Sequence, residues 1–236
     1  DGVFQEYVAH QGDLCFKLPE KVSTMEGALI EPLAVGFHAA MTGGARIGQT
    51  ALVTGAGCIG LVSMLALKAQ GVSRVYITDV VGKRLEKAGS LGAEEAINAA
   101  EQDPLQVIAE REEVDLVIET TGTDAAAAQG IKALKKGGTM VFVGYSKTGS
   151  MTLPMGLALD KELTLKTIFR YRHIYPLAID AVARGAVDIK SIVTNIFDFD
   201  DIRNAMERSV HDKAEIVKSV VKINNPAASG RGMLFS

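Results

Sequence analysis

The chain of 236 residues combines 47% hydrophobic with 22% charged residues and carries a formal net charge of −3. This composition is typical of a globular protein with a sizeable core, and the balanced charge argues against nucleic-acid and membrane-surface partners. No apolar run reaches the roughly eighteen residues of a membrane span, and no signal peptide is predicted. The two cysteines, Cys15 and Cys58, form neither a disulfide framework nor a Cys-x-x-Cys motif, which favours a reducing, cytoplasmic setting.

Between residues 51 and 171, short apolar runs alternate with longer helical patterns. The expected strands are ALVTGAG (51–57), RVYITD (74–79), EEAIN (94–98), VDLVIETTG (114–122), TMVFVGY (139–145) and ELTLKTIFRY (162–171). The expected helices are 58–71, 82–92, 103–111 (with Asp103 as N-cap and Pro104 at the first helical position) and 124–138. Apolar strands separated by helices indicate a parallel sheet that is covered on both faces. The sequence therefore predicts a doubly wound α/β domain.

The flanks of this region follow a different pattern. Two short strands are expected at 3–10 and 14–19, and a capping box of Ser23 and Glu26 is expected to open a helix. After residue 171, a helix, a strand, a helix and a strand are expected at 174–185, 191–199, 200–210 and 215–223. These flanks are predicted to form part of a second, mixed domain. Residues 224–236 show no periodicity and are expected to be a flexible tail.

Gly55, Gly57 and Gly60 form a Gly-x-Gly-x-x-Gly motif directly between an expected strand and an expected helix. Gly55 would permit a tight turn, Gly57 would let a pyrophosphate approach the backbone, and Gly60 would bring the helix close to the sheet. Asp79 closes the second strand, where a carboxylate can accept hydrogen bonds from the ribose of NAD and would repel a 2′-phosphate. The pattern favours NAD binding, with NAD preferred over NADP; the alternative is a glycine-rich turn that binds no nucleotide.

Other users of a glycine-rich turn fit less well. The first strand carries no acid, although methyltransferases usually have one there. None of the tyrosines has a lysine four residues later, as a short-chain dehydrogenase would need, and the P-loop pattern is absent.

Several segments together resemble the zinc-dependent medium-chain alcohol dehydrogenases. They are EGALIEPLAVGFHA, GQTALVTGAGCIG, TDVVGKRLEKAGSLGA, GGTMVFVGY and IFRYRHIYPLAI. Within that family the sequence is most similar to the sorbitol (L-iditol, xylitol) dehydrogenase subgroup, over residues 1 to 223. The resemblance implies NAD-dependent oxidation of a polyol to a ketose, by hydride transfer from an alcohol that is polarised by zinc.

The resemblance also implies roles for individual residues. Ile59, Asp79 and Arg84 would contact the adenosine half of NAD. The nicotinamide end would be lined by Val143, Gly144 and Tyr145, and the meeting point of cofactor and polyol by Phe169, Arg170 and Tyr171. Arg170 and Tyr171 would act as catalytic-site residues, because they offer donors for the hydroxyl groups of a polyol.

Glu31 is the one carboxylate in the apolar stretch ALIEPLAVGFHAA. By resemblance it would belong to the coordination sphere of the catalytic zinc, directly or through a water. The alternative is a carboxylate at the start of a helix that Pro32 begins. His38 lies two helical turns further on and is expected to be a core residue rather than a ligand.

The resemblance places a catalytic GroES-like domain at 1–35, a NAD-binding Rossmann domain at 36–171, a return to the catalytic domain at 172–223 and the tail at 224–236. The family's first zinc ligands have no counterpart here, so we expect this chain to be a portion of a longer polyol dehydrogenase that binds NAD and is inactive alone. The alternatives are a zinc-free reductase, a related alcohol or butanediol dehydrogenase, and a non-catalytic NAD-binding module. Open strand edges predict a homo-oligomer, either a dimer or a tetramer.

Overall fold

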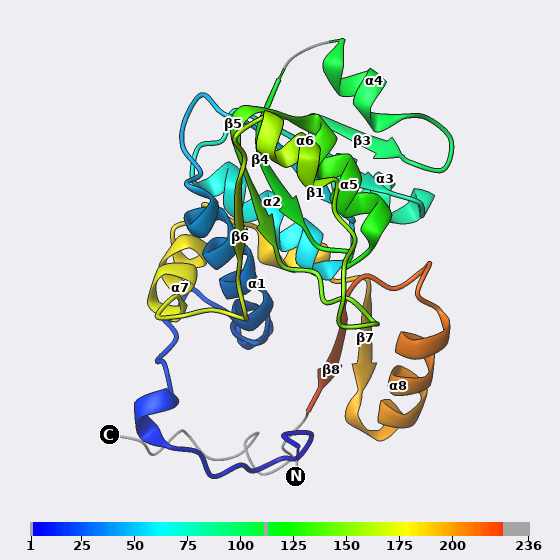
Figure 1. Ribbon diagram of the computed structural model, residues 1–236. Coiled ribbons are helices and arrows are strands. Elements are labelled where there is room, and N and C mark those ends of the chain that lie inside the picture. Colours follow the sequence, from blue (N-terminus) through cyan, green and yellow to red (C-terminus); the bar gives the residue numbers. More distant parts are fainter. Residues whose placement is uncertain (1, 111–112, 224–236) are drawn as a thin grey trace. The chain divides into compact units, whose positions relative to one another are not determined.

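The computed structural model describes residues 2–110 and 113–223, which fall into two compact units (Figure 1). One unit comprises Leu18–Ile192, and the other combines the chain up to Lys17 with the chain from Val193 onward. These divisions differ from the boundaries expected after residues 35 and 171. The assignment of the flanks to a catalytic domain stays a prediction.

The larger unit is built on a six-stranded sheet with the order β3-β2-β1-β4-β5-β6, and all its neighbouring strands are parallel. The strands are β1 (Thr50–Thr54), β2 (Arg74–Asp79), β3 (Glu95–Asn98), β4 (Val114–Glu119), β5 (Leu134–Phe142) and β6 (Thr164–Thr167). Every residue of β1 is buried, as expected for a strand covered on both faces. The predicted doubly wound α/β fold is thereby confirmed.

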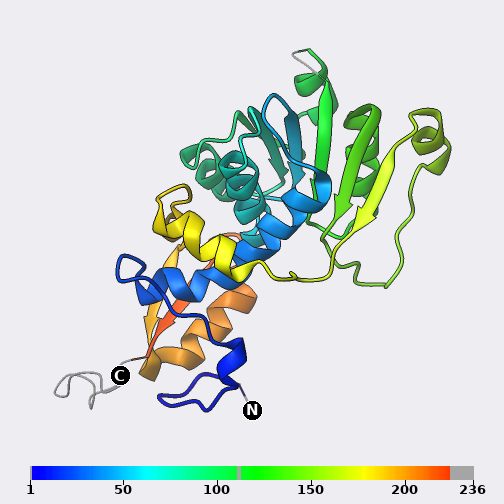
Figure 2. The same cartoon turned by 90° about the vertical axis from the view of Figure 1, so that its left-hand side faces the viewer.

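Helices cover both faces of this sheet (Figure 2). On one face α1 (Thr24–Gly43) packs across α2 (Cys58–Ala69), and α7 (Tyr175–Ala183) packs against α1. On the other face α4 (Pro104–Ala109), α5 (Asp124–Ala133) and α6 (Met155–Asp160) bury a core with apolar side chains of the sheet. Helix α3 (Gly82–Ser90) follows β2 and packs on β2 and β3. None of the helices in the described ranges is long and apolar enough to cross a membrane.

Helix α1 begins at the predicted capping box. The Ser23 backbone N–H donates to the Glu26 carboxylate at 2.7 Å, and the Ser23 hydroxyl accepts from the Glu26 N–H. The helix then continues through Pro32 to Gly43, so the expectation that Pro32 starts a helix is wrong. The capping box sets the start at Thr24, well upstream of Pro32, and the buried apolar residues on both sides of Pro32 keep the segment helical.

Element ends in the second half of the large sheet also differ from expectation. Helix α5 ends at Ala133 instead of residue 138, and Lys161 donates from Nζ to the carbonyls of Lys132 and Leu134 at 2.7 and 2.6 Å at that end. Strand β6 stops at Thr167, so residues 168–171 are not part of it. Helix α6 was not predicted, because its short sequence MGLALD lacks a clear helical period.

The smaller unit contains the parallel pair β7 (Asn195–Asp198) and β8 (Ser219–Lys222) together with α8 (Ile202–His211). The strands expected at 3–10 and 14–19 are wrong: within residues 2–17 the regular structure is a 3₁₀ turn at Gly12–Leu14. An extended segment becomes a strand only beside a pairing neighbour, and residues 2–17 stay exposed, with Tyr7 at 68%. The tail expected at 224–236 lies outside the described residues.

Candidate functional site

The turn between β1 and α2 places the three motif glycines in distinct environments. Gly55 has a φ of 93°, a region open mainly to glycine, and its N–H donates to the Thr78 carbonyl at 2.7 Å. A Cβ on Gly60 would stand 1.8 Å from the Gly55 carbonyl oxygen, so only glycine lets α2 approach the turn this closely. Gly57 is the N-cap residue of α2 and has open space where a Cβ would stand. The turn therefore exposes backbone at the start of a helix, where an anion is favoured.

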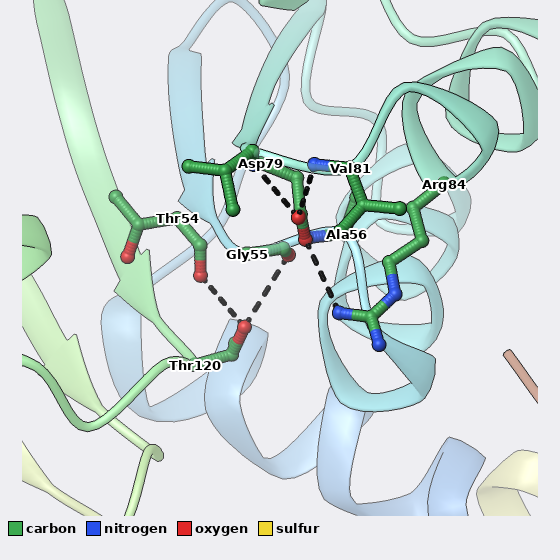
Figure 3. A network of polar contacts seen from close by, with 8 residues as sticks. Thr54, Gly55, Ala56, Asp79, Val81, Arg84 and Thr120 are labelled. Atoms are coloured by element: carbon green, nitrogen blue, oxygen red, sulfur yellow. Dashed lines mark hydrogen bonds and ion pairs between the residues drawn. The ribbon is translucent and has the colours of Figure 1, made fainter. Parts of the chain in front are cut away.

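Asp79 holds this turn in place from the end of β2 (Figure 3). Its Oδ2 accepts from the Ala56 N–H at 2.7 Å, and its Oδ1 accepts from the N–H groups of Val80 and Val81 at 2.8 and 3.0 Å. Arg84 reaches the same carboxylate, with Nη1 3.7 Å from Oδ2, and the Asp79 side chain is only 8% exposed. The carboxylate is thus fixed at the carboxyl edge of the sheet.

The end of strand β4 also contacts the glycine turn, through Thr120. The Thr120 hydroxyl, just after β4, donates to the Thr54 carbonyl at 2.7 Å and lies 3.3 Å from the Gly55 carbonyl oxygen (Figure 3). The strand order reverses between β1 and β4, and in open parallel sheets ligands bind at such a switch point.

A pocket of about 670 Å³ opens along these strand ends. It brings together all six residues predicted for the adenosine and phosphate parts of a dinucleotide: Gly55, Gly57, Ile59, Gly60, Asp79 and Arg84. Sequence reasoning missed part of the lining, namely Cys58, Thr120, Thr121, Thr123 and Gln129. The sequence contained a signal for Thr120 and Thr121, since TTG closes the expected strand 114–122 and ligands bind at the carboxyl ends of parallel strands.

The residues predicted for the nicotinamide end lie just after β5. The N–H groups of Val143 and Gly144 donate to the Glu119 carbonyl at 2.8 and 2.9 Å, and Tyr145 is 84% exposed. Gly144 and Tyr145 line a neighbouring pocket of about 450 Å³. Their contact with a cofactor stays a prediction.

Phe169, Arg170 and Tyr171 follow the end of β6. The Arg170 guanidinium lies 5.3 Å from the centre of the Phe169 ring, and Arg170 has a φ of 57°, which is unusual for a residue with a side chain. The Tyr171 ring packs on that of Tyr175 with centres 5.0 Å apart, and the Tyr175 hydroxyl donates to the Tyr171 hydroxyl at 2.9 Å. Within the described chain, these three predicted residues lie outside the lining of the 670 Å³ pocket.

Glu31 is exposed on α1 and is therefore not a buried charge. The pKa of Tyr175 is raised, mainly by burial. The hydrogen bond and the charge of Tyr171 raise it further, and the charge of Glu31 makes the smallest contribution. This places Glu31 in the neighbourhood of the tyrosine pair. His38 is partly buried, and burial followed by the charge of Arg172 lowers its pKa.

A catalytic zinc needs three protein ligands and one open position. Among the residues that the structure describes, no group of three or more His, Cys, Asp or Glu side chains is arranged to hold a metal. These residues do not fit a zinc ion on their own, and Glu31 stays a predicted ligand.

The fold is a Rossmann-like α/β domain with a pocket at the switch point of its sheet, and comparisons with known proteins extend this assignment. The profile of the family described as zinc-binding dehydrogenase matches residues 58–184. The chain is 39% identical over 227 residues to an uncharacterized zinc-type alcohol dehydrogenase-like protein, YdjJ, of Escherichia coli (strain K12), covering 95% of this chain and 65% of that protein. It is 38% identical over 212 residues to the sorbitol dehydrogenase of Macaca fascicularis, covering 88% and 59%. The chain belongs to the zinc-binding dehydrogenase family.

Solved structures agree with this assignment. A structure described as a short chain alcohol dehydrogenase from Escherichia coli CFT073, complexed with NADH, superposes with a TM-score of 0.89 at 26% identity, covering 94% of this chain and 66% of that one. A zinc-binding dehydrogenase from Sinorhizobium meliloti 1021, bound to NADP, gives 0.82 at 26% identity, covering 87% and 62%. This chain spans about 59 to 65% of the length of the two curated relatives.

Proposed function

We propose that this chain supplies the NAD-binding part of a zinc-dependent polyol dehydrogenase, which oxidises a polyol of the sorbitol or xylitol type to the ketose. The observation that carries the proposal is the 670 Å³ pocket, in which the glycine turn and the fixed Asp79 carboxylate meet at the switch point of the sheet. The sorbitol dehydrogenases among the relatives support the substrate class.

The residues present fit a dinucleotide. The turn from Gly55 to Gly60 would receive the pyrophosphate at the start of α2, Asp79 would accept from the ribose, and Ile59 and Arg84 would border the adenosine. Gly144 and Tyr145 would border the nicotinamide. When bound, NAD would supply a hydride acceptor for the carbinol carbon of the substrate, and the hydroxyl proton of the alcohol would pass to solvent.

The position of Asp79 favours NAD over NADP. A 2′-phosphate would face this carboxylate at close range, and both carboxylate oxygens are already oriented by backbone N–H groups. Arg84 is the nearby cation that could offset the phosphate charge, but it lies beside Asp79. Structures of relatives contain NADH in one case and NADP in another, so the family alone does not decide the cofactor. We expect the preference of this chain to depend on Asp79 and Arg84.

At the substrate end, Arg170 and Tyr171 would donate hydrogen bonds to polyol hydroxyl groups, with Glu31 nearby on α1. Tyr175 orients the Tyr171 hydroxyl. The described residues do not fit a zinc ion by themselves.

Calorimetric titration of this chain with NADH and NADPH tests the cofactor proposal. We expect NADH to bind, and Asp79→Ala to weaken NADH binding by about tenfold more than NADPH binding, because the charge that repels the 2′-phosphate is lost. Asp103→Ala is the matched control: Asp103 also accepts a backbone N–H, from Leu105 at 3.0 Å, but does so at the start of α4. Equal losses for both cofactors would remove Asp79 as the ribose-reading residue.

A non-catalytic NAD-binding module is the second candidate, favoured by the lack of a three-ligand cluster among the described residues. A related diol dehydrogenase would share the same pocket. Zinc analysis and NAD-dependent oxidation of sorbitol, xylitol and butanediol by the complete gene product separate these possibilities. Absence of both zinc and oxidation would favour the module.

The proposal includes a cytoplasmic homo-oligomer, either a dimer or a tetramer. Strand β6 lies at an edge of the sheet, and three of its four residues are exposed, which suits pairing between strand edges. Light scattering tests this part, and a strictly monomeric protein would contradict it.

A further inference from the structure

Glu119, the last residue of β4, is fully buried. Its Oε1 accepts from the N–H groups of Thr121 and Gly122 at 2.7 and 3.0 Å and from the Thr121 hydroxyl. Its backbone carbonyl accepts from the N–H groups of Val143 and Gly144 at 2.8 and 2.9 Å. One residue therefore fixes two turns, the first after β4 and the second after β5.

The two turns also touch each other directly. Gly122 has a φ of 70°, and a Cβ there would lie 2.4 Å from the Tyr145 carbonyl oxygen. A Cβ on Gly144 would lie 2.2 Å from the Gly122 nitrogen and 2.7 Å from Glu119 Oε2. Backbone thus packs against backbone, and the Glu119 carboxylate lies at the contact.

The turns line different pockets. Thr120 and Thr121 line the 670 Å³ pocket beside the glycine turn, whereas Gly144 and Tyr145 line the 450 Å³ pocket. The Thr120 hydroxyl also links the first turn to the end of β1, at the Thr54 carbonyl, and to the glycine turn, at the Gly55 carbonyl. Glu119 consequently connects the region proposed for the phosphates to the region proposed for the nicotinamide.

We propose that Glu119 is a positioning residue that sets the nicotinamide end of the pocket relative to the phosphate end. The inference rests on the proposed binding of NAD. Because the side chain is buried and held by several donors at once, it defines a single arrangement of the two turns. A dinucleotide bridging both regions depends on that arrangement, whereas ADP-ribose, which lacks the nicotinamide, occupies only the phosphate and adenosine region.

The test compares NADH with ADP-ribose by calorimetry for the unmodified chain and for Glu119→Gln. Glu119 Oε2 also accepts from the Gly122 N–H, at 3.2 Å. In either orientation, the amide of glutamine therefore turns an N–H donor toward a backbone N–H that now donates to the carboxylate. We expect the dissociation constant for NADH to rise about tenfold while that for ADP-ribose changes by less than about twofold. The fluorescence of the bound nicotinamide should also shift toward that of free NADH.

Asp115→Asn is the matched control. Asp115 lies at the other end of the same strand and accepts the Thr50 N–H at 2.8 Å. This variant makes the same chemical change away from both turns, so the ratio of the two affinities should match that of the unmodified chain.

Gly144→Ala is a second route to the same effect, since its Cβ would push the turns apart while the carboxylate stays intact. It should reproduce the selective loss of NADH, and it keeps the test valid if Glu119→Gln does not fold. Equal losses of NADH and ADP-ribose in both variants, or no loss in either, would overturn the inference. If the unmodified chain bound neither ligand, the proposed function itself would fail.

Discussion

The carboxylates at the two ends of strand β4 have different structural roles. At the amino end, Asp115 accepts the Thr50 N–H, pairs with Lys135 and keeps 19% of its side chain exposed. At the carboxyl end, Glu119 is fully buried and is held by the N–H groups and the hydroxyl of the turn that follows it. The amino edge of the sheet thus uses its charges to stabilise the fold, whereas the carboxyl edge uses them to shape turns around a pocket.

If the carboxyl edge of the sheet is shaped around a pocket, a change in the packing of its glycine turn should have a large effect. The largest effect is expected for Gly60→Ala. Its Cβ would stand 1.8 Å from the Gly55 carbonyl oxygen, and a clash between backbone and Cβ cannot be relieved by a rotamer change. We expect loss of measurable NADH binding and a decrease of about 2–4 kcal/mol in the free energy of unfolding, measured by calorimetry and urea denaturation.

Gly57→Ala serves as its control, because open space surrounds that position. Stability should change by less than about 0.5 kcal/mol, with binding weakened by the loss of close access to the backbone. Unchanged stability in Gly60→Ala would mean that the carboxyl edge tolerates far more movement than its packing indicates.

A smaller, pH-dependent effect is expected at the amino edge for Asp115→Asn. Burial acts to raise the pKa of Asp115, but hydrogen bonds from Lys135 and Thr50 and the charges of Lys135 and Arg46 outweigh it and lower the pKa below 3.8. A carboxyl group with a lowered pKa in the folded state stabilises the fold above its unfolded pKa, and this contribution is lost as the pH falls through the folded pKa.

At pH 7 the asparagine variant should therefore be less stable by about 1 kcal/mol, allowing for the partial exposure of the pair. The difference from the unmodified chain should shrink below about pH 4, as measured by urea denaturation at a series of pH values. A difference that stays constant down to pH 2.5 would show that the charge of Asp115 has no part in it.

The smallest expected effect is a gain in the free energy of unfolding, from Gly89→Ala. Gly89 lies within α3, and a Cβ there would meet no atom within 4 Å. Gly89→Ala should raise the free energy of unfolding by about 0.5–1 kcal/mol, because alanine restricts the unfolded chain and favours the helix. Thermal denaturation measures the gain, and NADH affinity should stay the same. A loss of stability would contradict this prediction, because it would mean that the space around Gly89 is not open.

The parts of this structure that follow from local sequence were predictable. The apolar strands, the glycine turn and the position of Asp79 at a strand end each depend on a short stretch of chain. The short edge strand β3 was also found, from EEAIN, since it follows the same alternation.

The parts of the structure that depend on residues distant in the sequence could not be predicted. Residues 3–10 have a strand-like composition but no pairing strand within the described chain, so they remain exposed. Glu119 looked like an ordinary strand residue because its importance comes from Val143 and Gly144, which follow a different strand. Pro32 was misread as a helix start because the packing of α1, rather than local propensity, carries the helix through it.

The strand order also has a consequence for how the chain folds. Strands β1 to β3 and strands β4 to β6 are each joined by nearby segments, and among the described strands the two halves of the sheet pair through β1 and β4. Thr50 and Asp115, which meet at this seam, are 65 positions apart, so their contact requires closure of a long loop and is expected to form late. The 670 Å³ pocket is lined from both sides of the seam. A dinucleotide would therefore bind chains in which the halves have joined, and by mass action it would shift the equilibrium toward that joined state.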